Sequence, residues 1–366
     1  MTWKQILKNN SKDFIEQLKK NDVLNKNLKI YSETLQELLL QRFKKSESID
    51  STAQVFKQFI KEGRKQCNTK DYDLFMVTEA FSFFYFLDRY ERLWDILIFL
   101  TEENILPLSE SHLNAFVIGS GPGNDFYPIN DFYTELYNYL RTKKISISNN
   151  IKFYSVEKSK SMNNFFNEFN HMIKNKSVNV ELFSDDFKYF DLGNSRYKEL
   201  EKKEENIWNA IMKGEETDET VALAHSETNK LFRYKFVVMS NFLTAESRQF
   251  NEFSEELESF FEDANAGTIF VIIGANGDSY DETVYEPLKK IAQKLSFKCI
   301  EREKQYGNVN SQTIIKEFQS NICKELAKLA NLDIEKFKKE AGGFCSEQLS
   351  SKKALDYKIL LARKGR

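Results

Sequence analysis

Three glycines stand at alternate positions in one short stretch of the chain. Residues 116–125 read FVIGSGPGND, so Gly119, Gly121 and Gly123 directly follow an apolar run. Glycine lets a backbone turn tightly and lets a ligand approach it closely. A helix is predicted at 131–141, and the N-terminus of a helix offers free N–H groups to an anionic group. The stretch therefore predicts a ligand-binding loop, with a turn that holds no ligand as the alternative.

The spacing of the glycines narrows the class of ligand. A phosphate loop of the Walker type needs Gly-Lys followed by Ser or Thr, and the stretch lacks that sequence. The dinucleotide fingerprint is G-x-G-x-x-G. Here the third glycine comes one residue earlier, and Asn124 stands at the glycine position of the fingerprint. This argues against a nicotinamide-dependent enzyme, which stays open as an alternative.

Polar residues follow three further apolar runs, which end at positions 156, 183 and 239. These residues are Glu157 after the first run, Asp185 and Asp186 after the second, and Ser240 and Asn241 after the third. In open α/β sheets, ligands bind at the carboxyl ends of the strands. We therefore expect these side chains to gather beside the glycine loop.

Together with a C-terminal apolar run at 357–362, the order of these pieces resembles the class I S-adenosylmethionine-dependent methyltransferases, over about residues 110–366. The resemblance implies an α/β, Rossmann-like methyltransferase fold with a seven-stranded, mostly parallel sheet. It also implies S-adenosylmethionine as the cofactor, S-adenosylhomocysteine as the product, and transfer of a methyl group to a nitrogen or oxygen acceptor.

The same resemblance implies the roles of single residues. The cofactor-binding residues would be Gly119, Ser120, Gly121, Gly123, Asp125, Glu157, Asp185, Asp186, Phe187 and Ser240. The glycine loop would lie along the methionine part of the cofactor. Glu157 would accept hydrogen bonds from the ribose hydroxyls, because a carboxylate accepts at two oxygens and donates nothing. Asp186, or Asp185, would hold the adenine amino group, with Phe187 near the adenine.

One position departs from the pattern of the family. Many members carry an acid two residues before the first glycine of the loop, and Val117 stands there in this chain. Asp125, on the other side of the loop, is the candidate substitute. This departure, together with two predicted insertions near 191–234 and 302–355, keeps a second hypothesis open: a methyltransferase-like fold that is catalytically silent and acts as a binding or scaffold protein.

The acceptor has no signature in the sequence. Amine methyltransferases that act on exocyclic amines carry a Pro-Pro-aromatic run at the end of the fourth strand, whereas Asn241 is followed by Phe-Leu. The candidate catalytic residues are Asn241 and Tyr85. Tyr85 lies in the aromatic stretch 83–90, which would either cap an acceptor pocket or form the core of a helical bundle.

Apolar periodicity divides the chain into two parts. Helical spacing continues through 1–108, which predicts an all-α N-terminal domain and a possible acceptor cap. Strand and helix patterns alternate through 109–366, which predicts a mostly parallel sheet. Two stretches, near 191–234 and 302–355, are longer than the fold requires and are predicted to be insertions.

Composition limits the function classes. The chain has 366 residues, with 53 Lys and Arg against 55 Asp and Glu, so its net charge is −2. This favours a small-molecule or protein acceptor over naked nucleic acid. Local basic clusters at 42–45 and 141–144 keep an RNA- or ribosome-associated methyltransferase open.

No pair among the four cysteines has metal-ligand spacing, so no metal site is expected and reduced thiols are predicted. The most apolar stretch, 81–100, carries five charged residues, which argues against a membrane span. We therefore expect a cytoplasmic protein; the oligomeric state is left open.

Overall fold

The computed structural model describes residues 3–46, 48–62, 71–108, 113–145, 150–183, 234–243, 247–306, 309–340 and 355–365. Three predicted site residues, Asp185, Asp186 and Phe187, lie outside these ranges. So does the expected insertion near 191–234, apart from its last residue, and a part of the second insertion.

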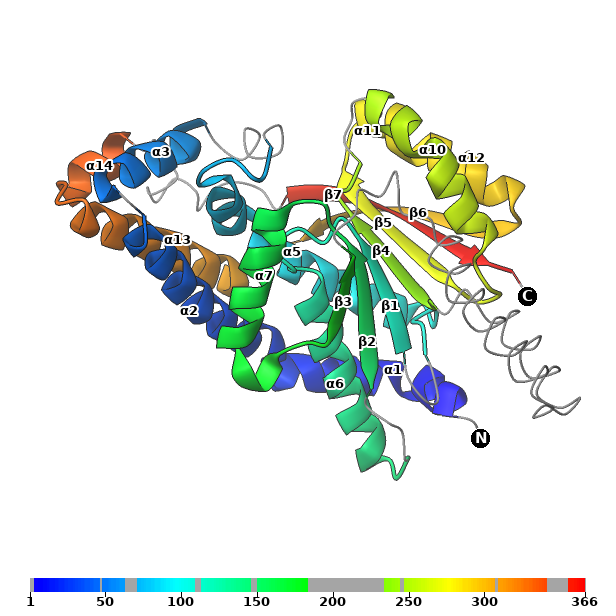
Figure 1. Cartoon of the computed structure of the whole chain (residues 1–366). Coiled ribbons are helices and arrows are strands. Elements are labelled where there is room, and N and C mark those ends of the chain that lie inside the picture. Colours follow the sequence, from blue (N-terminus) through cyan, green and yellow to red (C-terminus); the bar gives the residue numbers. More distant parts are fainter. Residues whose placement is uncertain are drawn as a thin grey trace, which may run out of the picture.

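Seven strands form one sheet (Figure 1). They are β1 (Leu113–Ile118), β2 (Ile151–Val156), β3 (Val180–Phe183), β4 (Phe236–Ser240), β5 (Ile269–Ala275), β6 (Phe297–Tyr306) and β7 (Leu355–Lys364). Their order across the sheet is β3-β2-β1-β4-β5-β7-β6. The pairs among β1 to β5 are parallel, whereas β7 runs antiparallel to both β5 and β6. The seven-stranded, mostly parallel sheet predicted from the sequence is confirmed.

The register brings the predicted site segments to one edge. Ile118, the last residue of β1, pairs with Val156 at the end of β2 and with Met239 in β4. The glycine loop, Glu157 and Ser240 each follow one of these residues in the chain. They therefore leave the sheet side by side at its carboxyl edge.

The sheet is covered on both faces, which explains why its strands are continuous apolar runs rather than alternating ones. One face, with Val117, Val238 and Val271, packs in the same hydrophobic cluster as helices α6 (Phe126–Thr142) and α7 (Lys160–Met172). The opposite face, with Phe116 and Phe270, packs against α10 (Ser247–Glu262) and α12 (Glu286–Lys294).

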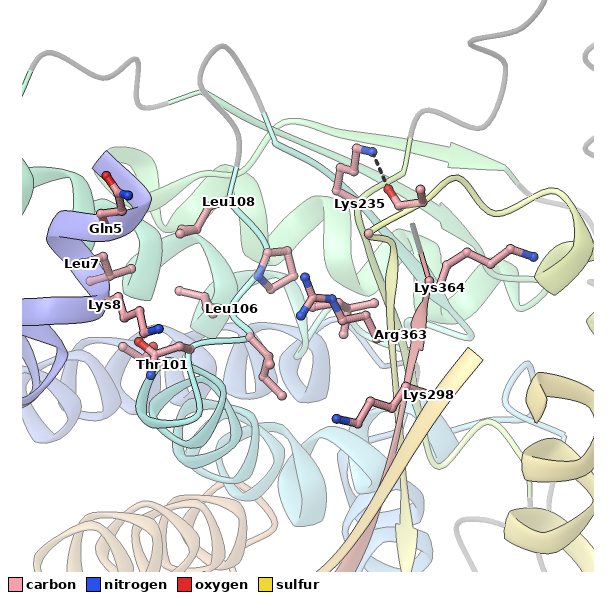
Figure 2. Close-up of a pocket in the computed structure, with 17 residues that line it drawn as sticks. Gln5, Leu7, Lys8, Thr101, Leu106, Leu108, Lys235, Lys298, Arg363 and Lys364 are labelled. Carbon is pink, nitrogen blue, oxygen red and sulfur yellow. Dashed lines mark hydrogen bonds between the residues drawn. The ribbon is translucent and has the colours of Figure 1, made fainter. Parts of the chain in front are cut away.

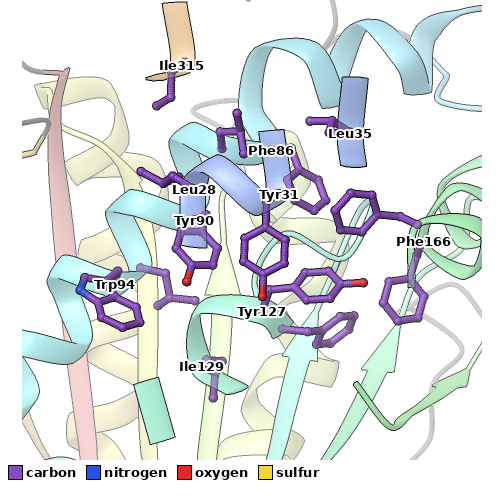
Figure 3. Packing of buried hydrophobic residues seen from close by; sticks show 14 of the residues in the cluster. Leu28, Tyr31, Leu35, Phe86, Tyr90, Trp94, Tyr127, Ile129, Phe166 and Ile315 are labelled. Carbon is purple, nitrogen blue, oxygen red and sulfur yellow. The ribbon is translucent and has the colours of Figure 1, made fainter. Parts of the chain in front are cut away.

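The N-terminal helices are α1 (Trp3–Lys20), α2 (Val23–Lys44), α3 (Ile49–Glu62) and α5 (Val77–Glu102). They belong to the same continuous cluster as the first face of the sheet. In Figure 3, the Tyr31 ring from α2 packs on Tyr90 from α5 and on Tyr127 from α6. The predicted boundary at 108 stays a prediction, because a shared core neither requires nor excludes two domains.

The second insertion joins the N-terminal helices. Helix α13 (Val309–Leu329) runs along α2, and α14 (Ile334–Glu340) lies beside α3 (Figure 1). The remaining short elements are η1 (Lys174–Lys176), α11 (Asp278–Tyr280) and the π-helical turn η3 (Asp281–Tyr285). Segments far apart in the chain thus complete one helical layer.

Helix α5 is buried over nearly its whole length and carries its charges inside the protein. These charges have partners: Glu79 pairs with Arg42 at 2.6 Å, and Asp95 accepts from Tyr357 Oη at 3.0 Å. Burial of an ionised group is tolerated when it is paired and hydrogen-bonded. Among the described helices, none is long and apolar enough to cross a membrane.

The cysteines depart in one respect from the expectation of reduced thiols. Cys323, buried in α13, is disulfide-bonded. Cys299, in β6, is a free thiol. Sequence spacing cannot reveal a bridge between cysteines that only the tertiary fold brings together.

Candidate functional site

The glycine loop connects β1 to α6 and has a backbone that other residues rarely adopt. Gly119, Gly121 and Gly123 have φ angles of +66°, +55° and +87°. In this left-handed region a Cβ atom clashes with the backbone, which is why the sequence places glycine at each position. Asn124 and Asp125 follow at the start of α6 and are 0% and 1% exposed.

Glu157, from the end of β2, holds the loop. Its Oε2 accepts from the backbone N–H of Gly121 at 2.8 Å, and its Oε1 accepts from the N–H of Ser159 at 2.9 Å. Burial raises the pKa of the Glu157 carboxyl, and these two hydrogen bonds oppose the rise. Glu157 therefore faces the loop, as predicted; its contact with a ribose stays a prediction.

Aromatic rings lie against the open sides of the glycines. A Cβ atom on Gly119 would lie 2.7 Å from Cδ2 of Phe242, and one on Gly121 would lie 3.6 Å from Cε1 of Phe81. A Cβ atom on Gly123 would overlap the ring of Phe166. The loop is thus packed tightly on protein side chains, and a ligand that approaches Gly119 must displace the Phe242 ring.

Two arginines of α5 reach the end of β4. Arg92 donates from Nη2 to Ser240 Oγ at 2.7 Å. With the Asn241 amide oriented to satisfy its neighbours, its oxygen accepts from Nη2 of both Arg89 and Arg92 at 3.2 Å. The Arg89 guanidinium also lies 5.1 Å from the centre of the Tyr85 ring. These contacts bring Tyr85, Ser240 and Asn241, all predicted site residues, into one cluster.

Several buried polar atoms of this cluster have no hydrogen-bond partner among the described residues. They are both side-chain oxygens of Asp125, the side-chain oxygen and nitrogen of Asn124, and Nε of Arg89 and of Arg92. A buried polar group without a partner is costly, and such groups in native proteins call for an explanation. Here the set contains a carboxylate and two guanidinium groups next to a glycine loop.

Electrostatics couples these charges. Burial raises the pKa of Asp125 to about 6, while Arg89 and Arg92, and to a smaller extent the nearby side chains of Asn124 and Ser240, favour its ionised form. Burial lowers the pKa of Arg89, the neighbouring Arg92 adds to that effect, and Asp125 opposes it. Perturbed groups of this kind are typical of binding and catalytic sites.

Sequence reasoning missed Arg89, Arg92 and Asn124. A signal was present: the two arginines are three residues apart, on one face of a helix rich in apolar residues. From the sequence, these charges were used only to argue against a membrane span. Nothing in the sequence indicates that α5 packs over the end of β4. Within the described residues, no group of His, Cys, Asp and Glu side chains could hold a metal ion.

No protein-family model matches the chain, and no curated protein matches it. Solved structures are similar to this chain at low identity. A phosphoethanolamine N-methyltransferase 2 from Haemonchus contortus, in complex with S-adenosyl-L-methionine, is 12% identical with a TM-score of 0.38. The match covers 81% of this chain and 59% of that one, so it spans about three fifths of the nematode enzyme.

Two further structures show the range of similar proteins. Magnesium protoporphyrin IX methyltransferase from Synechocystis is 8% identical with a TM-score of 0.37, covering 87% of this chain and all of that one. A putative RNA methyltransferase from Pyrococcus horikoshii is 10% identical with a TM-score of 0.33, covering 76% and 85%. These identities and TM-scores carry no argument about this chain, and the acceptors of those enzymes are properties of those enzymes.

Proposed function

We propose that this chain is an S-adenosylmethionine-dependent methyltransferase. The strongest support comes from the side chains that surround the glycine loop. At the carboxyl edge of the sheet the loop is held by Glu157 and lies beside buried groups of both charges, Asp125 and the two arginines, which keep atoms without a hydrogen-bond partner. A ligand with an ammonium and a carboxylate would supply partners for these atoms.

The amino-acid half of S-adenosylmethionine fits that requirement, because it carries an ammonium and a carboxylate. Asp125 would accept hydrogen bonds from the ammonium, and Arg89 and Arg92 would donate to the carboxylate. Asp125 thereby takes the place of the acid that the family pattern puts at Val117. Each contact satisfies an atom that is buried without a partner in the protein alone.

The adenosine half would lie beyond Glu157. Each Glu157 oxygen accepts one backbone N–H, which leaves acceptor capacity for ribose hydroxyls. Asp186 or Asp185, with Phe187, would hold the adenine, as the resemblance implies. These assignments are part of the proposal.

The bound cofactor supplies an electrophilic methyl group on a positive sulfonium. The protein then has to align an acceptor with that methyl group and exclude water. Tyr85 and Asn241 lie in the same arginine cluster as Ser240 and are the candidates for contact with the acceptor. We propose a nitrogen or oxygen acceptor on a small molecule or a protein.

Isothermal titration of the full chain tests the proposed function. We expect S-adenosylhomocysteine and S-adenosylmethionine to bind saturably, with micromolar dissociation constants, and NAD not to bind. A dissociation constant of about 1 mM corresponds to about 4 kcal/mol of binding free energy. The absence of binding heat from both nucleosides at that concentration would contradict the proposal. Binding of NAD alone would favour a nicotinamide-dependent enzyme.

The ring of Phe242 supports a second candidate, the silent binding or scaffold protein. The ring closes the open side of Gly119. Phe242→Ala distinguishes the two. For an enzyme whose ring moves aside, the variant binds S-adenosylhomocysteine at least as tightly as the wild type. For a scaffold, neither the wild type nor the variant binds it.

A further inference from the structure

A cavity lies at the opposite edge of the sheet from the glycine loop. It has a volume of about 700 Å³. Its walls come from the start of α1, the end of α5 and the segment that follows it, the amino ends of β4 and β5, and the ends of β6 and β7 that meet there. Because β7 is antiparallel, its last residues, Arg363 and Lys364, point to this edge.

The lining of this cavity is apolar on one side. Leu7, Leu106 and Ile269 line it and are at most 7% exposed, and Ile105, Pro107 and Leu108 extend the same wall. An apolar wall favours a ligand with an apolar or aromatic body, because most small-molecule sites gain their affinity from such surface.

The charge of the lining has one sign. Among the described residues that line it, the ionisable side chains are Lys8, Lys235, Lys298, Arg363 and Lys364, with no Asp or Glu. In a protein with net charge −2, this concentration of cations is local. Like charges that share one concave surface repel each other, and an anion between them removes that repulsion.

Three of the cations are directed into the cavity. Figure 2 shows Lys8 of α1, Lys298 of β6 and Arg363 of β7 reaching inward from different elements, whereas Lys364 turns away. Lys364 instead lies 4.7 Å from the centre of the Phe297 ring, and Lys235 donates to the Ala266 carbonyl at 3.3 Å. Within the described part of the chain, the three inward cations have no ion pair or hydrogen bond.

We propose that this cavity binds a small amphipathic anion: an apolar or aromatic body with one carboxylate or phosphate group. Lys8, Lys298 and Arg363 hold the anionic group, and the wall around Leu106 covers the body. A bare nucleic-acid backbone matches the cations but leaves the apolar wall uncovered. The cavity lies at the amino edge of the sheet, away from the proposed cofactor site. The two proposals are therefore tested independently.

Isothermal titration of the full chain with octanoate and with phenyl phosphate tests the proposal. We expect at least one of the two to bind saturably, and the stronger one shows whether a carboxylate or a phosphate is preferred. 1-Octanol carries only the apolar body and inorganic phosphate only the anionic group. Each should bind at least tenfold more weakly. S-Adenosylhomocysteine should not compete.

Substitutions locate the binding. Lys298→Gln combined with Arg363→Gln should weaken the stronger probe at least tenfold. Lys364→Gln, the matched control on the same rim, should stay within twofold. All these side chains are at least partly exposed, so the thermal unfolding midpoint should not change. Should the double variant fold poorly, Lys8→Gln on the other wall provides the same test.

Three results would overturn the proposal. One is the absence of saturable binding of either probe at millimolar concentration. Another is an equal loss in Lys364→Gln and in the double variant. The third is displacement of the probe by a single-stranded RNA oligonucleotide that binds more tightly, which would make the surface a nucleic-acid interface.

Discussion

Arg92 and Ser240 are 148 residues apart in the chain, and Arg92 Nη2 donates to Ser240 Oγ at 2.7 Å inside the protein. This bond joins the middle of α5 to the carboxyl end of β4. It fixes the arginine cluster beside the glycine loop, and a helix of the N-terminal segment thereby becomes part of the candidate cofactor site. The predictions that follow test that arrangement.

Arg89→Met should weaken the binding of the amino-acid half of the cofactor and leave the binding of the adenosine half unchanged. We expect S-adenosylhomocysteine to bind about tenfold or more weakly, since a hydrogen bond to a charged group is worth about 1.5–3 kcal/mol. Methylthioadenosine, which lacks the amino-acid group, should bind as it does to the wild type. Titration calorimetry measures both. Arg302→Met, which removes an exposed ion pair with Glu103, is the control.

Equal losses for both ligands in Arg89→Met would contradict the assignment of the carboxylate to Arg89. They would mean that the arginine acts through the shape of the loop. In that case Arg92→Met, tested with the same two ligands, should also fail to discriminate between them.

Glu157→Gln should loosen the glycine loop. The carboxylate accepts from the N–H groups of Gly121 and Ser159, and an amide can accept only one of them. We expect a loss of about 1–3 kcal/mol in the free energy of unfolding, together with weaker S-adenosylhomocysteine binding. Urea unfolding and calorimetry measure these quantities.

The matched control is Glu181→Gln, which removes an exposed ion pair with Lys152. Such pairs contribute less than about 1 kcal/mol. If both variants lose the same small amount of stability, the buried hydrogen bonds of Glu157 do not hold the loop.

Asp125→Asn should change how stability depends on pH. The folded-state pKa is about 6, above the usual value near 3.9 of an unfolded Asp. The folded protein therefore binds more protons than the unfolded chain between these values, and Asp125 lowers stability as the pH rises through that window. At pH 7 the variant should be more stable by about 3 kcal/mol, and the difference should shrink towards pH 4.

The same variant should bind S-adenosylhomocysteine more weakly, because the amide no longer attracts the ammonium. Urea unfolding from pH 4 to pH 8 gives the stability difference, and Asp278→Asn on an exposed turn is the control. A difference between wild type and Asp125→Asn that stays constant over this range would show that Asp125 titrates at its ordinary value.

Gly123→Ala should destabilise the protein more than Gly121→Ala. Both positions are left-handed, which costs an alanine about 1–2 kcal/mol. At Gly123 the new methyl group also overlaps the Phe166 ring, and overpacking adds about 1–3 kcal/mol. Urea unfolding of both variants compares them. Phe166→Leu should relieve part of the loss in Gly123→Ala, and no relief would mean that the backbone alone causes it.

The strands and the glycine loop could be predicted from the residues alone. Continuous apolar runs predicted the seven strands, since a strand covered on both faces needs no polar alternation. The glycines predicted the turn after β1, because a left-handed backbone restricts the residue type locally. Glu157 was identified because it directly follows a strand, and parallel strands end at a common edge.

The residues that surround that loop depend on how distant elements pack together. Arg89 and Arg92 belong to the site because α5 crosses the end of β4, and Phe242 and Phe166 close the glycines because their own elements pack there. The basic cavity likewise exists because an antiparallel β7 brings Arg363 to the edge where α1 carries Lys8. Contacts between distant segments depend on strand order and helix packing, which no local pattern of residues encodes.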